Sequence, residues 1–126
     1  MAKIKSNTDI EQSKVLAEIL PIESADMSYS IIHNIGQEPY HCNVPTFTYV
    51  ANGDIPCWSL AALLRVIPKH IKDYNVLRID IGDNDFSIWY DEIGSGVNND
   101  LPNVTKESEV DACVNMIVEL KERNLI

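Results

Sequence analysis

The strongest hydrophobic pattern in the chain lies in residues 54–68, where an apolar stripe stands between two sets of helix-boundary residues. Asp54 can accept hydrogen bonds from the free N–H groups of a first helical turn, and Pro56 suits that turn because its missing N–H would be unpaired there. Pro68 cannot continue a helix. The pattern therefore predicts a buried helix over residues 54–68.

Two further segments have helical patterns, one near each end of the chain. Thr8 and Glu11 have the spacing of a capping box, and the one-sided apolar run that follows them ends at Pro21. Near the other end, we expect Thr105 to open a last helix that packs on the sheet. Its apolar stripe consists of Val110, Cys113, Val114, Ile117 and Leu120 or Lys121.

Alternating apolar and polar residues predict two short strands in the first half of the chain. Residues 27–31 and 46–50 both alternate, and the second run precedes a turn at residues 52–54. Pro39 and Pro45 interrupt the intervening segment, for which we expect a long loop.

The clearest alternation predicts a β-hairpin over residues 75–91, with two strands flanking the four-residue loop 82–85. One register makes a whole face of this hairpin apolar, which strongly favours it over any register shifted by one residue. Its cross-strand pairs are Ile81 with Phe86, Ile79 with Ile88, and Leu77 with Tyr90.

The opposite face of the hairpin then carries Arg78, Asp80, Ser87 and Trp89, with Arg78 directly across from Trp89 and able to stack on the indole. An exposed Trp beside an Arg is a typical anchor pair of a protein interface. The alternative is that a helix or loop covers this face and makes Trp89 part of the core. Arg78, Asp80 and Trp89 are thus the candidate interaction surface.

Together these elements predict one α+β domain over residues 1–126. An antiparallel sheet of three to four strands would pack in two layers with N-terminal, central and C-terminal helices. The 126 residues, 45% of them hydrophobic, are enough for one domain with its own core.

The composition indicates a cytoplasmic protein. The first ten residues contain no apolar core of a secretory signal, and no later apolar run approaches the roughly 20 residues that span a bilayer. The three cysteines are odd in number and widely spaced, which fits reduced thiols better than a disulfide framework.

The net charge of −9 argues against direct nucleic-acid binding, because an acidic surface repels phosphate. The charge is spread over both halves of the chain, so neither half is a basic module. Solubility is the simpler explanation of this charge. An acidic protein can also occupy a basic site on a nucleic-acid-binding protein, and this alternative stays open.

The chain carries no nucleophile elbow, phosphate loop, dinucleotide fingerprint or paired-cysteine metal motif, so we assign no catalytic residue, metal or cofactor. Two clusters that resemble metal sites fail on spacing. In the calcium-like cluster Asp83, Asn84 and Asp85 follow Gly82 instead of preceding it, which favours a hairpin turn. The clusters are His33, His41, Cys42 and Cys57 for zinc, and Asp80, Asp83, Asn84 and Asp85 for calcium.

Cys57 is the one candidate for nucleophilic chemistry. At the start of the predicted helix it would feel the favourable end of the helix dipole, with His41 or His70 as a base. A buried structural thiol is the favoured alternative, since one sequence does not reveal spatial proximity. We expect Cys113 and Trp58 to be core residues.

Four segments of the chain resemble a family of small uncharacterised proteins that occur in gut-type bacteria and in their phages and mobile elements. The family has no assigned activity, so the resemblance implies only a context, that of an intracellular accessory protein of phage or mobile-element type. The matching segments are residues 20–27, 54–64 with Pro68, 89–90 and 111–117, of which 56–64 is the most specific.

Three functions remain as hypotheses, in this order. The first is a non-enzymatic interaction protein that binds another protein through its acidic surface or through Arg78 and Trp89. The second is a small thiol enzyme that uses Cys57, and the third is an acidic nucleic-acid mimic. The sequence predicts no direct contact with nucleic acid or membrane, and it leaves the oligomeric state open.

Overall fold

The computed structural model describes residues 5–32, 40–41, 47 and 53–126, and within them it confirms the α+β class. The elements, in chain order, are α1 (Ile10–Ile19), the 3₁₀ turn η1 (Ile22–Ser24), β1 (Met27–Tyr29), β2 (Ile31–Ile32), β3 (Tyr40–His41), β4 (Ile55–Cys57), α2 (Leu60–Val66), β5 (His70–Ile71), β6 (Asn75–Ile81), β7 (Phe86–Glu92), β8 (Gly96–Val97), β9 (Val104–Lys106) and α3 (Glu109–Glu122).

The largest sheet has five antiparallel strands, in place of the three to four predicted. Its path is β5-β6-β7-β8, and β9 pairs with β7 on the same edge as β8, further along the strand. β5 and β8 are two residues long, which is too short to show an alternating pattern in the sequence. Two smaller pairs, β1 with β4 and β2 with β3, complete the described strands.

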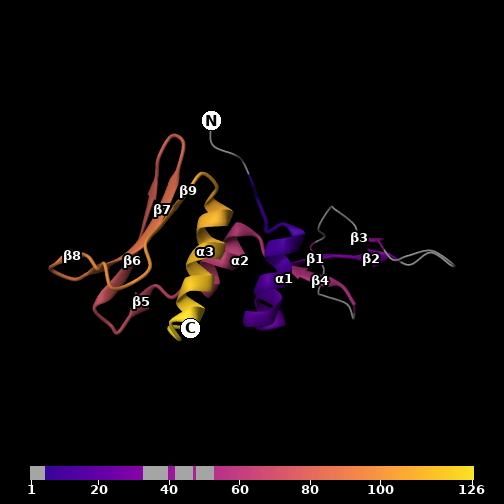
Figure 1. Cartoon of the computed structure of the whole chain (residues 1–126), viewed down its shortest axis with the longest axis horizontal. Helices are drawn as coiled ribbons and strands as arrows, with labels where there is room; N and C mark the ends of the chain where they lie inside the picture. Colours follow the sequence, from indigo (N-terminus) through magenta and orange to yellow (C-terminus); the bar gives the residue numbers. More distant parts are fainter. Residues whose placement is uncertain (1–4, 33–39, 42–46, 48–52) are drawn as a thin grey trace.

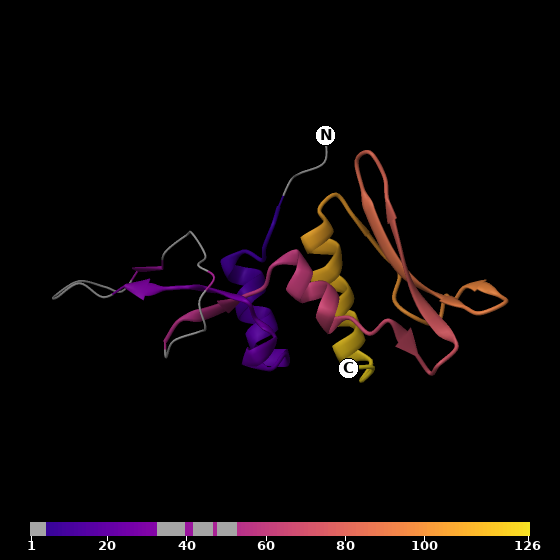
Figure 2. The same ribbon diagram turned by 180° about the vertical axis from the view of Figure 1, so that it is seen from behind.

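All three helices lie on one side of the five-stranded sheet (Figure 1). α3 packs directly on β7 and β9, α2 packs on α3, and α1 contacts both α3 and β4. The β1–β4 pair lies beyond α1, at the opposite end of the molecule from the sheet, as the reverse view also shows (Figure 2). The helices therefore form a layer that covers only one face of the sheet.

The core lies between this helix layer and the sheet. The predicted stripe of α3 is confirmed, because Val110, Cys113, Val114, Ile117 and Leu120 are all buried. Trp58 is also fully buried, as predicted, and its indole N–H donates to Ser24 Oγ at 2.9 Å. A second small cluster contains Met27, Tyr29, Ile55 and Cys57, with Ile10 packed against it.

The predicted register of the β6–β7 hairpin is confirmed in all three apolar pairs. The two strands of its apolar face nevertheless differ in burial. On β7, Phe86, Ile88 and Tyr90 are buried under α3, whereas on β6 the side chains of Ile79 and Ile81 are 41% and 69% exposed. α3 contacts β7 and β9, so the outer half of the apolar face is uncovered.

The predicted start of the central helix is wrong. Asp54 does not cap it and Pro56 is not in its first turn, because Ile55–Cys57 is strand β4, which pairs with β1. Ser59 is the actual N-cap and accepts from the N–H of Ala62 at 3.2 Å. The predicted end is confirmed, since α2 stops at Val66, two residues before Pro68.

The capping box of α1 lies one residue later than predicted. Asp9 and Gln12 form it, not Thr8 and Glu11. Asp9 Oδ1 accepts from the Gln12 N–H at 2.8 Å, and Gln12 Oε1 accepts from the Asp9 N–H at 3.1 Å. Both pairs have the required spacing, but the Thr8 side chain is fully buried in other hydrogen bonds. The helix ends at Ile19, before Pro21, as predicted.

The last helix also begins later than predicted. Thr105 belongs to β9, where it pairs with Ser87, and Ser108 is the N-cap of α3. The predicted helix start falls in strand β9 (Val104–Lys106), which the sequence pattern did not distinguish from a loop.

The single strand predicted at residues 27–31 is present as two strands, β1 and β2, in different sheets. Its alternation suggests one buried and one exposed face, but Met27, Ser28 and Tyr29 are all buried. Phe47 is exposed, and the rest of the predicted strand at residues 46–50 lies outside the described residues. Gly53 lies in a turn with φ of 93°, a backbone conformation that favours glycine. None of the helices in the described part of the chain has the length and apolar character needed to cross a membrane.

The boundary of α2 gives a first test. Ser59 caps the helix and is itself held by Asp26, which accepts from both the N–H and the hydroxyl of Ser59. Ser59→Ala should lower the free energy of unfolding by about 1–2 kcal/mol, measured by urea denaturation. Ser95→Ala, at an exposed loop position, should change it by less than about 0.5 kcal/mol. Equal effects of the two changes would contradict this assignment of the cap.

Candidate functional site

The structure places the three residues of the candidate interaction surface on one face of the sheet. Arg78 pairs with Trp89 and Asp80 pairs with Ser87, and these positions alternate with the apolar ones along β6 and β7. This outer face points away from all three helices (Figure 2). Neither a helix nor a described loop makes Trp89 a fully buried core residue, since its side chain is half-buried.

Asp91 holds Trp89 and Arg78 together on this outer face. The indole Nε1–H of Trp89 donates to Asp91 Oδ1 at 2.8 Å, and Arg78 Nε donates to Asp91 Oδ2 at 3.3 Å. One carboxylate thus orients both side chains, which reduces the conformational entropy that a binding partner would have to remove. The sequence contained the signal, because Asp91 lies two residues after Trp89 and therefore on the same face of a strand.

The remaining polar side chains of this face have different environments. Ser87 and Thr105 share a hydrogen bond of 2.8 Å between their hydroxyls across β7 and β9. Asp80 is exposed and forms no ion pair with any described residue. The structure therefore brings Arg78 and Trp89 together and leaves Asp80 apart from them.

The hairpin also offers an unpaired strand edge, which the sequence analysis missed. β5 pairs with β6 only opposite Asn75 and Val76, and the N–H of Leu77 donates to the carbonyl of Lys69 at 2.9 Å. Because backbone groups alternate in direction along a strand, those of Ile79 and Ile81 point the same way as the Leu77 N–H. No described strand reaches them.

Exposed apolar side chains surround this edge and the outer face. They are Ile79 and Ile81 near the hairpin tip, Ile93 just after β7, and Val97 on β8. Val97 pairs with Asp91 and so belongs to the outer face. An unpaired edge with exposed isoleucines is a site where another chain can pair.

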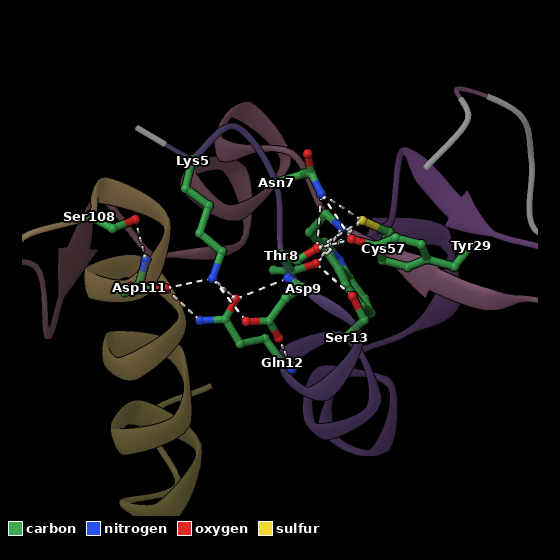
Figure 3. A network of polar contacts seen from close by, with 11 residues as sticks. Lys5, Asn7, Thr8, Asp9, Gln12, Ser13, Tyr29, Cys57, Ser108 and Asp111 are labelled. Carbon is green, nitrogen blue, oxygen red and sulfur yellow. Dashed lines mark hydrogen bonds and ion pairs between the residues drawn. The ribbon is translucent and has the colours of Figure 1, made fainter. Parts of the chain in front are cut away.

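Cys57, the candidate nucleophile, is fully buried on β4 in a cluster of polar groups (Figure 3). Its thiol donates to the carbonyl oxygen of Thr8 at 3.4 Å, and Thr8 Oγ1 donates to the Cys57 sulfur at 3.5 Å. Asn7 Nδ2 lies 3.7 Å from the same sulfur. The hydroxyl of Tyr29 also donates to the Thr8 carbonyl, at 2.8 Å. Burial, and secondarily the nearby Cys57, raises the pKa of Tyr29 to about 12.

The structure does not provide the surroundings that thiol catalysis requires. Because Cys57 lies on a strand, the predicted contribution of a helix dipole is lost. His70 is exposed on β5, in a different sheet from Cys57. His41 is in β3, and its side chain lies outside the described part of the structure. Cys113 is a core residue as predicted, and burial raises the pKa of its thiol to about 12.

A second polar network lies beside the first and joins both ends of the chain (Figure 3). Lys5 Nζ donates to Asp9 Oδ2 at 3.0 Å, to Gln12 Oε1 at 2.8 Å and to Asp111 Oδ1 at 2.9 Å. Gln12 Nε2 donates to Asp111 Oδ1 at 2.7 Å. Burial alone would raise the pKa of Asp9 and Asp111, but hydrogen bonds and the Lys5 charge lower both below the ordinary value. The network fixes the N-terminal segment and α1 to the first turn of α3.

Neither of the two metal-like clusters of the sequence forms a site in the described residues. No group of three or more His, Cys, Asp or Glu side chains among them is arranged to hold a metal ion. His33 and Cys42 of the zinc-like cluster lie outside the described residues. Asp83, Asn84 and Asp85 form the exposed hairpin loop, which the Gly82 N–H closes by donating to the Asp85 carbonyl at 2.9 Å.

No protein-family model, curated protein or solved structure matches this chain.

The Lys5 network predicts that the free energy of unfolding depends on pH in the acidic range. The folded-state pKa values of Asp9 and Asp111 lie below the ordinary 3.8, so their ionised forms stabilise the fold above that pH. This stabilisation is lost as the pH falls through the folded-state values. The free energy of unfolding, measured by urea denaturation, should fall between about pH 5 and pH 2. Asp111→Asn should roughly halve the part of this decline that comes from the network.

Two further variants make this test specific. Lys5→Gln removes the shared cation and should flatten the decline in the same way. Asp83→Asn changes a carboxylate in the exposed hairpin loop, away from the network, and should leave the decline as in the wild type. A decline unaltered by Asp111→Asn would contradict the stabilising role of this network.

The environment of Cys57 predicts low reactivity. Because the thiol is fully buried and hydrogen-bonded, iodoacetamide near neutral pH should label Cys57 in the folded protein at least about 100-fold more slowly than in the urea-unfolded protein. Peptide mass spectrometry separates the labelling of the three cysteines. Labelling of Cys57 that is faster in the folded protein would instead indicate an activated thiolate.

Proposed function

We propose that this protein is a non-enzymatic interaction protein that binds another protein through its β6–β7 hairpin. The proposed binding surface consists of the outer face with Arg78, Asp91 and Trp89, and the adjoining strand edge with Ile79 and Ile81. We further propose a cytoplasmic accessory role of phage or mobile-element type, which the resemblance of residues 56–64 to small proteins of that context supports.

The observation that carries this proposal is the unpaired edge of β6 with two exposed isoleucines. Ile79 and Ile81 alternate with polar residues, so both project from the same face of an edge whose outward backbone groups are unpaired among the described strands. An extended segment of a partner can add to such an edge as a further strand. Main-chain hydrogen bonds would then supply affinity, and the isoleucines would supply apolar contact.

The outer face adds a rigid anchor. Trp and Arg are over-represented among residues that contribute most to binding energy, and here both are oriented by Asp91. Asp80, exposed on the same face, adds negative charge beside the edge. A partner with basic residues near its pairing segment would match this charge.

The two alternative functions have less support. The thiol enzyme would need an accessible Cys57 with a base, whereas the thiol is buried beside Asn7, Thr8 and Tyr29. The nucleic-acid mimic is supported by the net charge of −9 alone. We therefore favour the interaction protein.

The proposal is tested by capturing partners from a bacterial lysate with four tagged forms of the protein, which are the wild type, Ile81→Ser, Trp89→Ala and Val15→Ser. Ile81→Ser should lose a partner that the wild type captures, because it removes an exposed contact without disturbing the core. Val15→Ser is the matched control, since Val15 is also an exposed aliphatic residue but lies on α1. Any partner is then purified and its affinity measured, and we expect at least about a tenfold loss for Ile81→Ser and none for Val15→Ser.

The folded state of each variant is checked by its thermal unfolding curve. The proposal fails if Ile81→Ser and Trp89→Ala, both folded, retain every partner of the wild type with unchanged affinity. It also fails if Val15→Ser reduces binding as strongly as Ile81→Ser does.

A further inference from the structure

A pocket of about 480 Å³ lies where the end of α1, the following turn η1, helix α2 and the last turn of α3 meet. Its walls are mainly apolar, formed by Ile19 and Leu20 at the end of α1 and by Ala62 and Val66 on α2. This volume lies within the range of roughly 300–1,000 Å³ found for small-molecule sites. The pocket can therefore take a compact apolar group.

Two cationic side chains line the same pocket. Arg65 lies in the last turn of α2, and Lys121 lies in the last turn of α3. Both are exposed, and neither forms a hydrogen bond or ion pair with a described residue. Glu23 also lines the pocket. The side chains of Arg65, Lys121 and Glu23 together carry a charge of +1, in a protein whose net charge is −9.

These two cations differ from most other basic side chains of the described chain. Five others are engaged by acidic side chains or by backbone carbonyls: Lys5, Lys14, Lys69, Arg78 and Arg123. Arg65 and Lys121 benefit from the partial negative charge at the helix C-termini, which explains why cations are tolerated there. That interaction does not account for the convergence of both on one apolar pocket.

We propose that this pocket binds a small amphipathic carboxylate. Its aliphatic chain would lie against the apolar walls, and its carboxylate would lie between the guanidinium of Arg65 and the ammonium of Lys121. Hydrogen bonds between such charged groups are stronger than those between neutral groups, so the head group determines selectivity. This site is separate from the β6–β7 hairpin and does not depend on the proposed function.

Octanoate is a suitable probe, and octanamide is its control because it keeps the chain and removes the charge. Isothermal titration calorimetry should show binding of octanoate at least about tenfold tighter than that of octanamide. Arg65→Gln with Lys121→Gln should weaken octanoate binding by about tenfold or more and should abolish the preference over octanamide. Lys121→Arg, which keeps the charge, should retain binding.

Two matched controls separate this inference from general charge effects and from the proposed function. Lys106→Gln removes an exposed cation on β9, and Ile81→Ser alters the hairpin, so both should bind octanoate as the wild type does. Because Arg65 and Lys121 are exposed, their variants should remain folded, which circular dichroism checks.

Methyl chemical shifts in NMR provide a second, independent measurement. Addition of octanoate should perturb the methyl groups of Ile19, Ala62 and Val66 and leave those of Ile79 and Ile81 unchanged. The inference is overturned if octanamide binds as tightly as octanoate, if the double variant binds like the wild type, or if the perturbed methyl groups lie elsewhere.

Discussion

The buried hydrogen bonds of Thr8 are the contact on which the arrangement of the helices depends. The Thr8 N–H donates to the carbonyl of Trp58 at 2.9 Å, and the Trp58 N–H donates to Thr8 Oγ1 at 3.1 Å. The same hydroxyl lies 2.8 Å from that of Ser13 on α1. These bonds fix the beginning of α1 to the junction between β4 and α2, where a buried group without a partner would be costly. The large core residue Trp58 is positioned by the same contact.

The placement of α3 determines which surfaces remain for function. This helix lies over β7 and β9, so one strand of the hairpin is part of the core while its neighbour β6 extends past the helix layer. The isoleucines of β6 have the pattern of core residues but lack anything to cover them among the described elements. The buried apolar residues of the hairpin thus lie on β7 and its exposed isoleucines on β6, which allows a change at Ile81 to alter binding with little effect on the core.

The features predicted correctly from the sequence depend on local periodicity. The hairpin register follows from alternation within seventeen residues of chain, residues 75–91, and the α3 stripe follows from helical spacing. Helix starts were predicted less well. Thr8 and Asp9 can both cap α1, and Asp54 and Ser59 can both cap α2, so contacts with distant parts of the chain decide which residue does so. For the candidate site, the shared face of Arg78 and Trp89 was predictable. The exposure of Ile81 was not, because it depends on how far α3 extends over the sheet.

The order of the strands has a consequence for how the chain folds. Every strand of the five-stranded sheet comes from residues 70–106, and each pairs with a strand close to it in sequence. By contrast, Thr8 and Trp58 are 50 residues apart, and Lys5 and Asp111 are 106 residues apart. Closing such long loops costs conformational entropy that only a formed partner surface repays. The hairpin therefore closes a short loop of chain, whereas the contacts of the N-terminal segment bring together residues that are far apart in sequence and carry the larger entropic cost.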